Sequence, residues 1–138
     1  MHPDYDLTLS PPPLADYLRL RPDSGLSPVT EAQGEPALVN SWAWVHVRHR
    51  ASGEVVAMGR VIGDGGWYFH IADMATLPEH QKKGLGQAVL EALLEKIREE
   101  APPRPYVTLM ADEPGRPLYA KLGFVETAPH SLGMMLPR

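Results

Sequence analysis

A long amphipathic segment between two strand-like segments constrains the fold of this chain most strongly. The apolar residues of 85–100 recur at helical spacing, with charged residues on the opposite side, and Pro102-Pro103 ends the pattern. The stretch "WYFHIADMAT" (67–76) precedes this helix, "YVTLMA" (106–111) follows it, and both read as strands. A helix of this length between two strands makes a crossover unit, so we predict that the two strands are parallel neighbours.

The first of these strands also closes an antiparallel meander. Alternating residues at 42–50 and a second strand at 55–62 flank the turn at Ser52-Gly53, and the glycine-rich turn 63–66 leads into 67–76. A phosphate-binding loop at 63–66 is disfavoured because no helix follows it. The meander and the crossover together predict an α/β (α+β) fold with a mixed sheet.

The ends of the chain give weaker patterns. Residues 14–21 predict a short helix, whereas the Pro-, Gly- and Ser-rich stretch 22–36 predicts a mobile loop around one helical turn. Residues 115–123 predict a short helix closed by glycine, and "FVETA" and "LGMML" predict two further short strands near the C-terminus.

Composition narrows the class of protein. The chain has 138 residues, no cysteine and a formal net charge of −4. The lack of cysteine excludes disulfides, thiolate metal sites and cysteine nucleophiles. The negative charge argues against a general nucleic-acid binder, and no apolar run is long enough to span a membrane. We expect one cytoplasmic domain over residues 1–138, with no metal and no nucleic-acid or membrane partner.

The start of the long helix suggests an anion site. Two lysines run into Gly84-Leu85-Gly86, where the helix begins. The first N–H groups of a helix lack internal partners and the helix dipole is positive there, so a phosphate fits. The alternative is that the glycines only make a tight turn between strand and helix. No complete nucleotide-binding glycine motif is present, which leaves a mononucleotide-binding domain as a weaker hypothesis.

The order of the motifs resembles the GNAT superfamily of acyl-CoA-dependent N-acyltransferases. Gln81, Gly84 and Gly86 match the glutamine and paired glycines of that family, and the later Tyr119, Gly123 and Phe124 match its Tyr-x-x-x-Gly-Phe motif. The resemblance runs from about Trp42 to the C-terminus. It implies a sheet of about six to seven strands, with an antiparallel N-terminal meander, a splayed parallel pair in the middle and helices on both faces.

The resemblance also implies acetyl-CoA as the co-substrate. Its pyrophosphate would lie on the N–H groups of residues 82–87, and its pantetheine arm would pair with the backbone of residues 74–76. The cofactor-binding residues expected on this basis are Met74, Ala75, Thr76, Gln81, Lys82, Lys83, Gly84, Leu85, Gly86, Gln87 and Asp112. Asp112 departs from the asparagine that the family often carries seven residues before the tyrosine, which weakens that contact.

Tyr119 is the general acid that the resemblance implies. A phenol stays protonated at neutral pH, with an unperturbed pKa of about 10, and can donate its proton to the departing thiolate of CoA. Without the motif, a tyrosine that only packs on a short helix is the simpler interpretation.

Asp73 is the candidate general base because it lies within a strand beside the expected thioester position. A structural role is an equal alternative for a carboxylate placed there. His70 lies three residues earlier, so strand alternation places it on the opposite face from Asp73. Glu31 and Glu113 are expected in loops near the cleft.

The sequence therefore predicts an N-acetyltransferase. It would transfer the acetyl group directly, in a ternary complex, to a primary amine of a small molecule. Two alternatives stay open: a protein or peptide amine as acceptor, and a non-catalytic acyl-CoA-binding module. A homodimer also stays open.

Overall fold

The computed structural model describes all residues, 1–138, as one mixed sheet with helices on both faces. The strands follow the order β1-β2-β3-β4-β5 across the sheet. The elements in chain order are β1 (Tyr5–Thr8), α1 (Leu14–Asp23), α2 (Glu31–Asn40), β2 (Ala43–His49), β3 (Val55–Gly63), β4 (Tyr68–Thr76), η1 (Pro78–His80), α3 (Leu85–Glu100), β5 (Tyr106–Leu109), η2 (Glu113–Gly115) and α4 (Arg116–Lys121).

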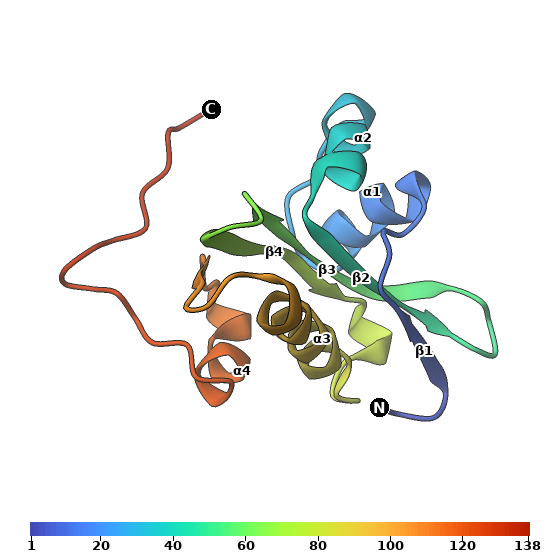
Figure 1. Cartoon of the computed structure of the whole chain (residues 1–138). Helices are drawn as coiled ribbons and strands as arrows, with labels where there is room; N and C mark the ends of the chain where they lie inside the picture. The colour runs from blue at the N-terminus through green and yellow to red at the C-terminus, as the bar shows by residue number, and fades with distance from the viewer.

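The helices divide into two layers. Figure 1 shows α1 and α2 on one face of the sheet and α3 and α4 on the other. Helix α3 is long enough to cover β2, β3 and β4, and its buried residues Leu85, Val89, Leu90, Leu93 and Ile97 form its side of the core. The apolar stripe read from the sequence is therefore the face that α3 packs on the sheet.

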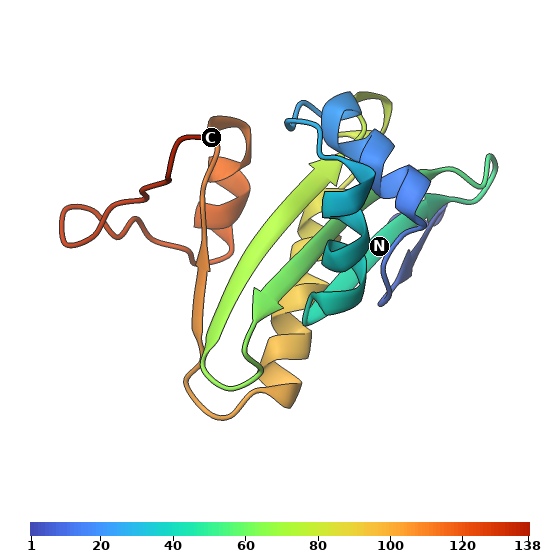
Figure 2. The same ribbon diagram turned by 90° about the horizontal axis from the view of Figure 1, so that it is seen from above.

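The predicted crossover is confirmed, and its two strands separate part of the way along. β4 and β5 are parallel and pair from Tyr68↔Tyr106 to Ile71↔Leu109. β5 ends there, whereas β4 continues to Thr76 and remains paired with β3. Figure 2 shows the two strands diverging towards α4. The second half of β4 thus borders an opening in the sheet.

A β-bulge lies in β4 beside this opening. Arg60 pairs with Ala72 and Met58 with Ala75, so Asp73 and Met74 together face the single residue Gly59. Asp73 takes the positive φ of +54° that such an irregularity can require. A Cβ at Gly59 would lie 2.6 Å from Met74 Sδ and 2.8 Å from Val89 Cγ1, so only glycine lets α3 approach the bulge this closely.

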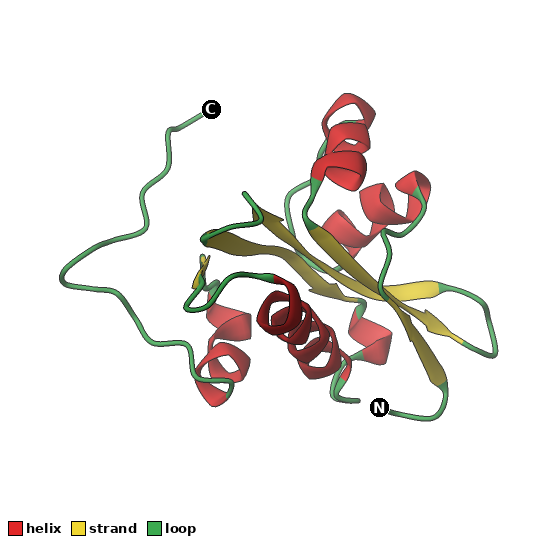
Figure 3. Ribbon diagram, viewed as in Figure 1, coloured by secondary structure: helices red, strands yellow, loops and turns green.

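The expectation of six to seven strands is not confirmed, because the sheet has five. The segments "FVETA" and "LGMML" form no strand, and Figure 3 draws the chain after α4 as loop. Apart from the half-buried Phe124, their large apolar residues stay exposed, up to 85% for Val125 and 90% for Leu136. Alternation alone does not make a strand when no hydrogen-bonding partner is reached.

The predicted loop 22–36 is also corrected, because its second part is helical. Thr30 and Gln33 form a capping box at the start of α2. Gly34 is buried, and a Cβ there would lie 2.9 Å from Leu14 Cδ1, so the glycine permits close packing of α2 on α1. The residues that are typical of a loop therefore form the start of α2 and its contact with α1.

Strand β1 was not predicted from the sequence. Tyr5 and Leu7 pair with His49 and Val47 at the outer edge of β2, and Tyr5 is buried. Four residues between polar neighbours are too short for a periodic signal.

None of the helices combines the length and the apolar character that a membrane-spanning segment needs.

Candidate active site

A cavity of about 210 Å³ occupies the opening between β4 and β5. It brings together the two residues proposed for catalysis, Tyr119 and Asp73, with Met74 and Asp112 from the proposed cofactor set. The full lining is Arg21, Leu26, His70, Ile71, Ala72, Asp73, Met74, Leu109, Met110, Asp112 and Tyr119. The cavity therefore contains ionisable side chains from both layers of the molecule.

Tyr119 enters this cavity from α4, on the side of the sheet that carries α3. Its ring lies across Gly115, where a Cβ would come within 2.7 Å of the ring. The backbone turns back after it, with Gly123 at φ +99° and the Phe124 N–H donating to the Tyr119 carbonyl at 3.0 Å. This explains the Tyr-x-x-x-Gly-Phe spacing. Burial, followed by the charge of Asp112, raises the pKa of Tyr119, so the phenol keeps its proton at neutral pH.

The start of α3 has the geometry expected of an anion site. Gly84 is the N-cap in the left-handed conformation at φ +80°, and the first backbone bond of the helix runs from Ala88 N to Gly84 O at 3.0 Å. The N–H groups before Ala88 point out of the helix without helical acceptors. Lys82 and Lys83 are exposed beside them, and buried Leu85 fixes the helix start to the core.

The remaining residues of the predicted cofactor set lie between the cavity and the start of α3. Met74, Ala75 and Thr76 form the end of β4, and the Gln81 side chain donates to the Thr76 carbonyl at 3.1 Å, which ties the loop before α3 to the strand. Gln87 is held by Lys121 of α4 at 2.8 Å. The set thus runs from the cavity to the start of α3.

Asp73 is held by three donors on the face that carries α1. Its carboxylate accepts from Tyr17 Oη at 2.9 Å, from Arg60 Nε at 2.6 Å and from Arg21 Nη1, and its side chain is 4% exposed. Burial, followed by the charge and the hydrogen bond of Asp73, raises the pKa of Tyr17 to about 12. Both carboxylate oxygens are engaged, which disfavours the base role predicted for Asp73 and favours the structural alternative.

His70 lies on the same face as Asp73, contrary to the prediction from strand alternation. The bulge adds one residue between them, which turns Asp73 to the side of His70 and Ala72 and turns Met74 to the α3 side. His70 and Asp73 consequently line the same cavity. Glu31 begins α2 and Glu113 begins η2, and neither lines that cavity.

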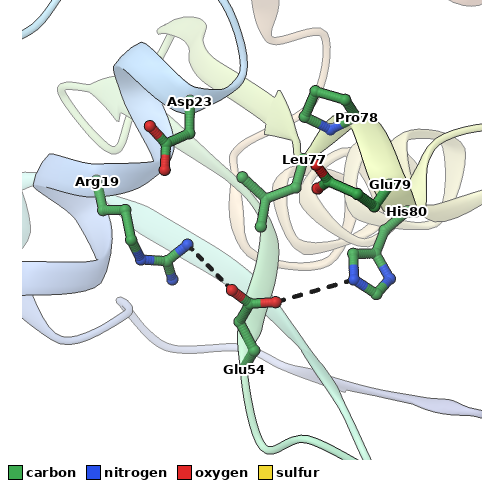
Figure 4. Close-up of a pocket in the computed structure, with 7 residues that line it drawn as sticks. All are labelled: Arg19, Asp23, Glu54, Leu77, Pro78, Glu79 and His80. Carbon is green, nitrogen blue, oxygen red and sulfur yellow. Dashed lines mark ion pairs between the residues drawn. The ribbon is translucent and has the colours of Figure 1, made fainter.

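A second, larger cavity of about 510 Å³ lies between α1, the start of β3 and η1. Figure 4 shows Glu54 between Arg19 and His80, at 3.5 Å from Arg19 Nη1 and 3.9 Å from His80 Nε2. A hydrogen bond of 2.7 Å also joins His80 Nδ1 to Tyr5 Oη. This larger cavity contains none of the motif residues, so we assign the chemistry to the smaller cavity.

The chain matches the family model of the acetyltransferase (GNAT) domain over residues 40–126. It is also similar to a Staphylococcus aureus protein described as a probable acetyltransferase, with 36% identity and a TM-score of 0.90, covering 97% of this chain and 99% of that chain. No protein with a curated description matches it in sequence.

Two more distant structures share the fold. Glucosamine-6-phosphate N-acetyltransferase of Arabidopsis thaliana has 17% identity and a TM-score of 0.74, covering 96% of this chain and 97% of that one. The ribosomal-protein-S18-alanine N-acetyltransferase of Escherichia coli has 18% identity and a TM-score of 0.74, covering 90% and 79%. One is named for a small amino sugar and the other for a protein, so the shared fold does not decide the acceptor.

Proposed function

The chain belongs to the GNAT family of acetyltransferases, and from that premise we propose that it transfers an acetyl group from acetyl-CoA to a primary amine of a small molecule. Acetyltransferases of this family use acetyl-CoA as co-substrate. The observation that carries the proposal is the position of Tyr119 in a cavity between the separated strands β4 and β5. The glycine-lined start of α3 supplies the matching anion site.

The proposed reaction is a direct transfer within a ternary complex. The amine nitrogen attacks the thioester carbonyl carbon, an N–C bond forms, and the C–S bond breaks. The amine loses a proton, and Tyr119 donates one to the sulfur as CoA leaves. A protonated phenol suits this step, and the raised pKa of Tyr119 keeps it in that form. No covalent intermediate on the protein is needed, in keeping with the absence of cysteine.

The cofactor site predicts a dependence on the pyrophosphate. Acetyl-CoA should bind at least about tenfold more tightly than acetyl-pantetheine, because only the former reaches the free N–H groups at the start of α3. Isothermal titration calorimetry on the purified protein measures both affinities. Gly86→Val should weaken acetyl-CoA binding while the protein stays folded, because a Cβ there meets only Leu118 Cδ2, at 3.5 Å.

Gly66→Val is the matched control for this experiment. Gly66 lies in the hairpin turn before β4, and a Cβ there would meet only Asp64 Oδ1, at 3.7 Å. Its acetyl-CoA affinity should equal that of the wild type. Equal affinities of the wild type for acetyl-CoA and acetyl-pantetheine would remove the helix start from the proposed site.

The acceptor class requires a comparison of amines. A panel of amino sugars, polyamines and amino acids is assayed beside peptides with a free N-terminus or a lysine, and the acetylated product is identified by mass spectrometry. We expect a small amine to give the highest kcat/KM. The cavity of about 210 Å³ supports this, because it is small and lies between strands. A peptide as the preferred acceptor would replace the small molecule with a protein or peptide amine.

The homodimer stays a prediction. The outer edge of β5 is unpaired, and the segment after α4 exposes apolar side chains such as Leu132 and Met135. An unpaired edge and exposed apolar surface favour association with another chain. Light scattering at micromolar concentration determines the oligomeric state.

A further inference from the structure

We propose that His70 is the general base that takes the proton from the acceptor amine, and that the Thr108 hydroxyl positions its imidazole. This inference rests on the proposed acetyl transfer and assigns a residue to its unassigned step. His70 is in β4 and Thr108 is its register partner in β5, so both lie in the part of the sheet where the two strands are still paired. The cavity opens next to them.

The hydrogen bonds around His70 leave one ring nitrogen free. Nδ1 lies 2.9 Å from Thr108 Oγ1, and Thr108 Oγ1 lies 3.3 Å from Tyr68 Oη. Nε2 has no hydrogen-bond partner in the protein, and since no buried side-chain nitrogen or oxygen lacks a partner, solvent reaches Nε2. A base needs an accessible lone pair, and Nε2 offers one within this cavity.

We assign the tautomer of His70 with Thr108 as the donor to Tyr68. When Thr108 donates its hydroxyl proton to Tyr68, its oxygen accepts from the Nδ1–H group of His70. The proton on Nδ1 then leaves the lone pair on Nε2. Protonation of Nε2 does not disturb this arrangement, because Nδ1–H remains a donor in the imidazolium. The hydroxyl of Thr108 therefore holds both the orientation and the reactive tautomer.

The surroundings of His70 keep the imidazole neutral. Burial, followed by the positive charge of Arg60, lowers the pKa of His70 below its ordinary value of about 6.5. At neutral pH the ring is therefore an available base. The ionisable side chains on the elements around it are Arg60 of β3, Arg21 of α1, Tyr68 and Asp73 of β4, Asp112 after β5 and Tyr119 of α4. Asp73 adds no free negative charge, because Arg21 and Arg60 pair with it.

The base and the acid then lie on opposite faces of the sheet. His70 shares the face of α1 with Asp73, whereas Tyr119 enters the same cavity from α4. Figure 1 shows α1 and α4 on opposite sides of the sheet. The proton leaves the amine nitrogen for Nε2 on one side, and the phenol proton moves to the sulfur on the other. The N–C bond forms and the C–S bond breaks between His70 and Tyr119. One proton leaves the amine and one proton reaches the sulfur.

The test measures the pH dependence of acetyl transfer with the best amine. In the wild type, kcat/KM for the amine should fall as the pH drops through the lowered pKa of His70, because the base becomes protonated. His70→Gln should lower kcat by roughly 10²-fold, at the lower end for a general base because water replaces it in part. That acidic decline should also disappear in His70→Gln. The affinity for acetyl-CoA should not change.

Three further variants separate chemistry from packing. His49→Gln replaces a histidine of β2 outside the cavity and should leave the pH profile intact. Thr108→Val keeps the shape but removes the acceptor for Nδ1–H, and should lower kcat by about tenfold, as expected for a base that loses its preferred tautomer. Thr108→Ser should restore the rate. ¹⁵N NMR of the imidazole should show the Nδ1-protonated tautomer in the wild type and its loss in Thr108→Val.

The outcomes separate this inference from the proposed function. An active wild type together with a folded His70→Gln variant of equal kcat and unchanged pH profile would overturn the base assignment and leave the acetyltransferase intact. An Nε2-protonated tautomer in the wild type would also overturn it. A wild type that acetylates no amine would overturn both.

Discussion

Asp73→Ala should lower the free energy of unfolding by about 3 to 5 kcal/mol, the range for removing one partner of a buried ion pair. The change leaves two guanidinium groups without their carboxylate, and the side chains of Arg21 and Arg60 are only 15% and 17% exposed. It also removes the acceptor of Tyr17 Oη. Urea denaturation followed by circular dichroism measures the loss. Asp73→Asn should cost less, because one oxygen acceptor is kept.

Asp6→Ala is the matched control for this prediction. Asp6 pairs with Arg50 at 2.8 Å, but both side chains are more than half exposed, so the free energy of unfolding should stay close to that of the wild type. Should Asp73→Ala fail to fold, Arg21→Met provides a milder test of the same cluster. Wild-type stability in both Asp73→Ala and Arg21→Met would contradict the structural role that we assign to Asp73.

Tyr119→Phe should reduce turnover by roughly 10²–10⁴-fold, the range for loss of a general acid. The variant deletes one hydroxyl and keeps the ring that packs across Gly115, so the fold should persist. The Michaelis constant for acetyl-CoA should change far less, because the lost interaction strengthens mainly in the transition state. The assay is thiol release with the best amine, together with a thermal melt.

Tyr106→Phe controls for the loss of a phenol hydroxyl elsewhere. Tyr106 is 40% exposed and stacks on Trp67 with ring centroids 5.0 Å apart, away from the cavity lining. It should retain full turnover. A folded Tyr119→Phe variant with turnover near that of the wild type, under conditions where chemistry limits the rate, would remove the acid assignment. The acyl-CoA site would stand, because it depends on Gly84 and Gly86.

The parts of the fold that the sequence predicted are those with a strong period or a strong stop signal. The stripe of α3, its end before Pro102 and the two strands around it specify the crossover, and the structure confirms it. The turns at Gly53 and 63–66 likewise specify the meander. The resemblance to the GNAT superfamily predicted that Tyr119 and Asp73 would lie at one site, and both line the cavity between the parallel strands.

The rest depended on contacts between distant residues. The bulge at Asp73 arises where Gly59 of the neighbouring strand accommodates Met74 and α3, and nothing within 67–76 interrupts the alternation. The extra residue of the bulge turns Asp73 to the other face of the sheet. Strand alternation therefore did not predict the partners of Asp73 or the face that it shares with His70. The loop-like composition of 22–36 concealed α2, because Gly34 serves a packing contact with α1 rather than a turn.

The central claim is that this protein moves an acetyl group directly from acetyl-CoA to an amine. Its most direct test is a measurement of thiol release by the purified protein with and without each amine of the panel. Mass spectrometry then gives the masses of the amine and of the protein after the reaction. For direct transfer we expect amine-dependent thiol release, one acetyl group on the amine for each thiol and no acetyl group on the protein. Tight acetyl-CoA binding without release for any small or peptide amine would contradict it and identify a non-catalytic acyl-CoA-binding module.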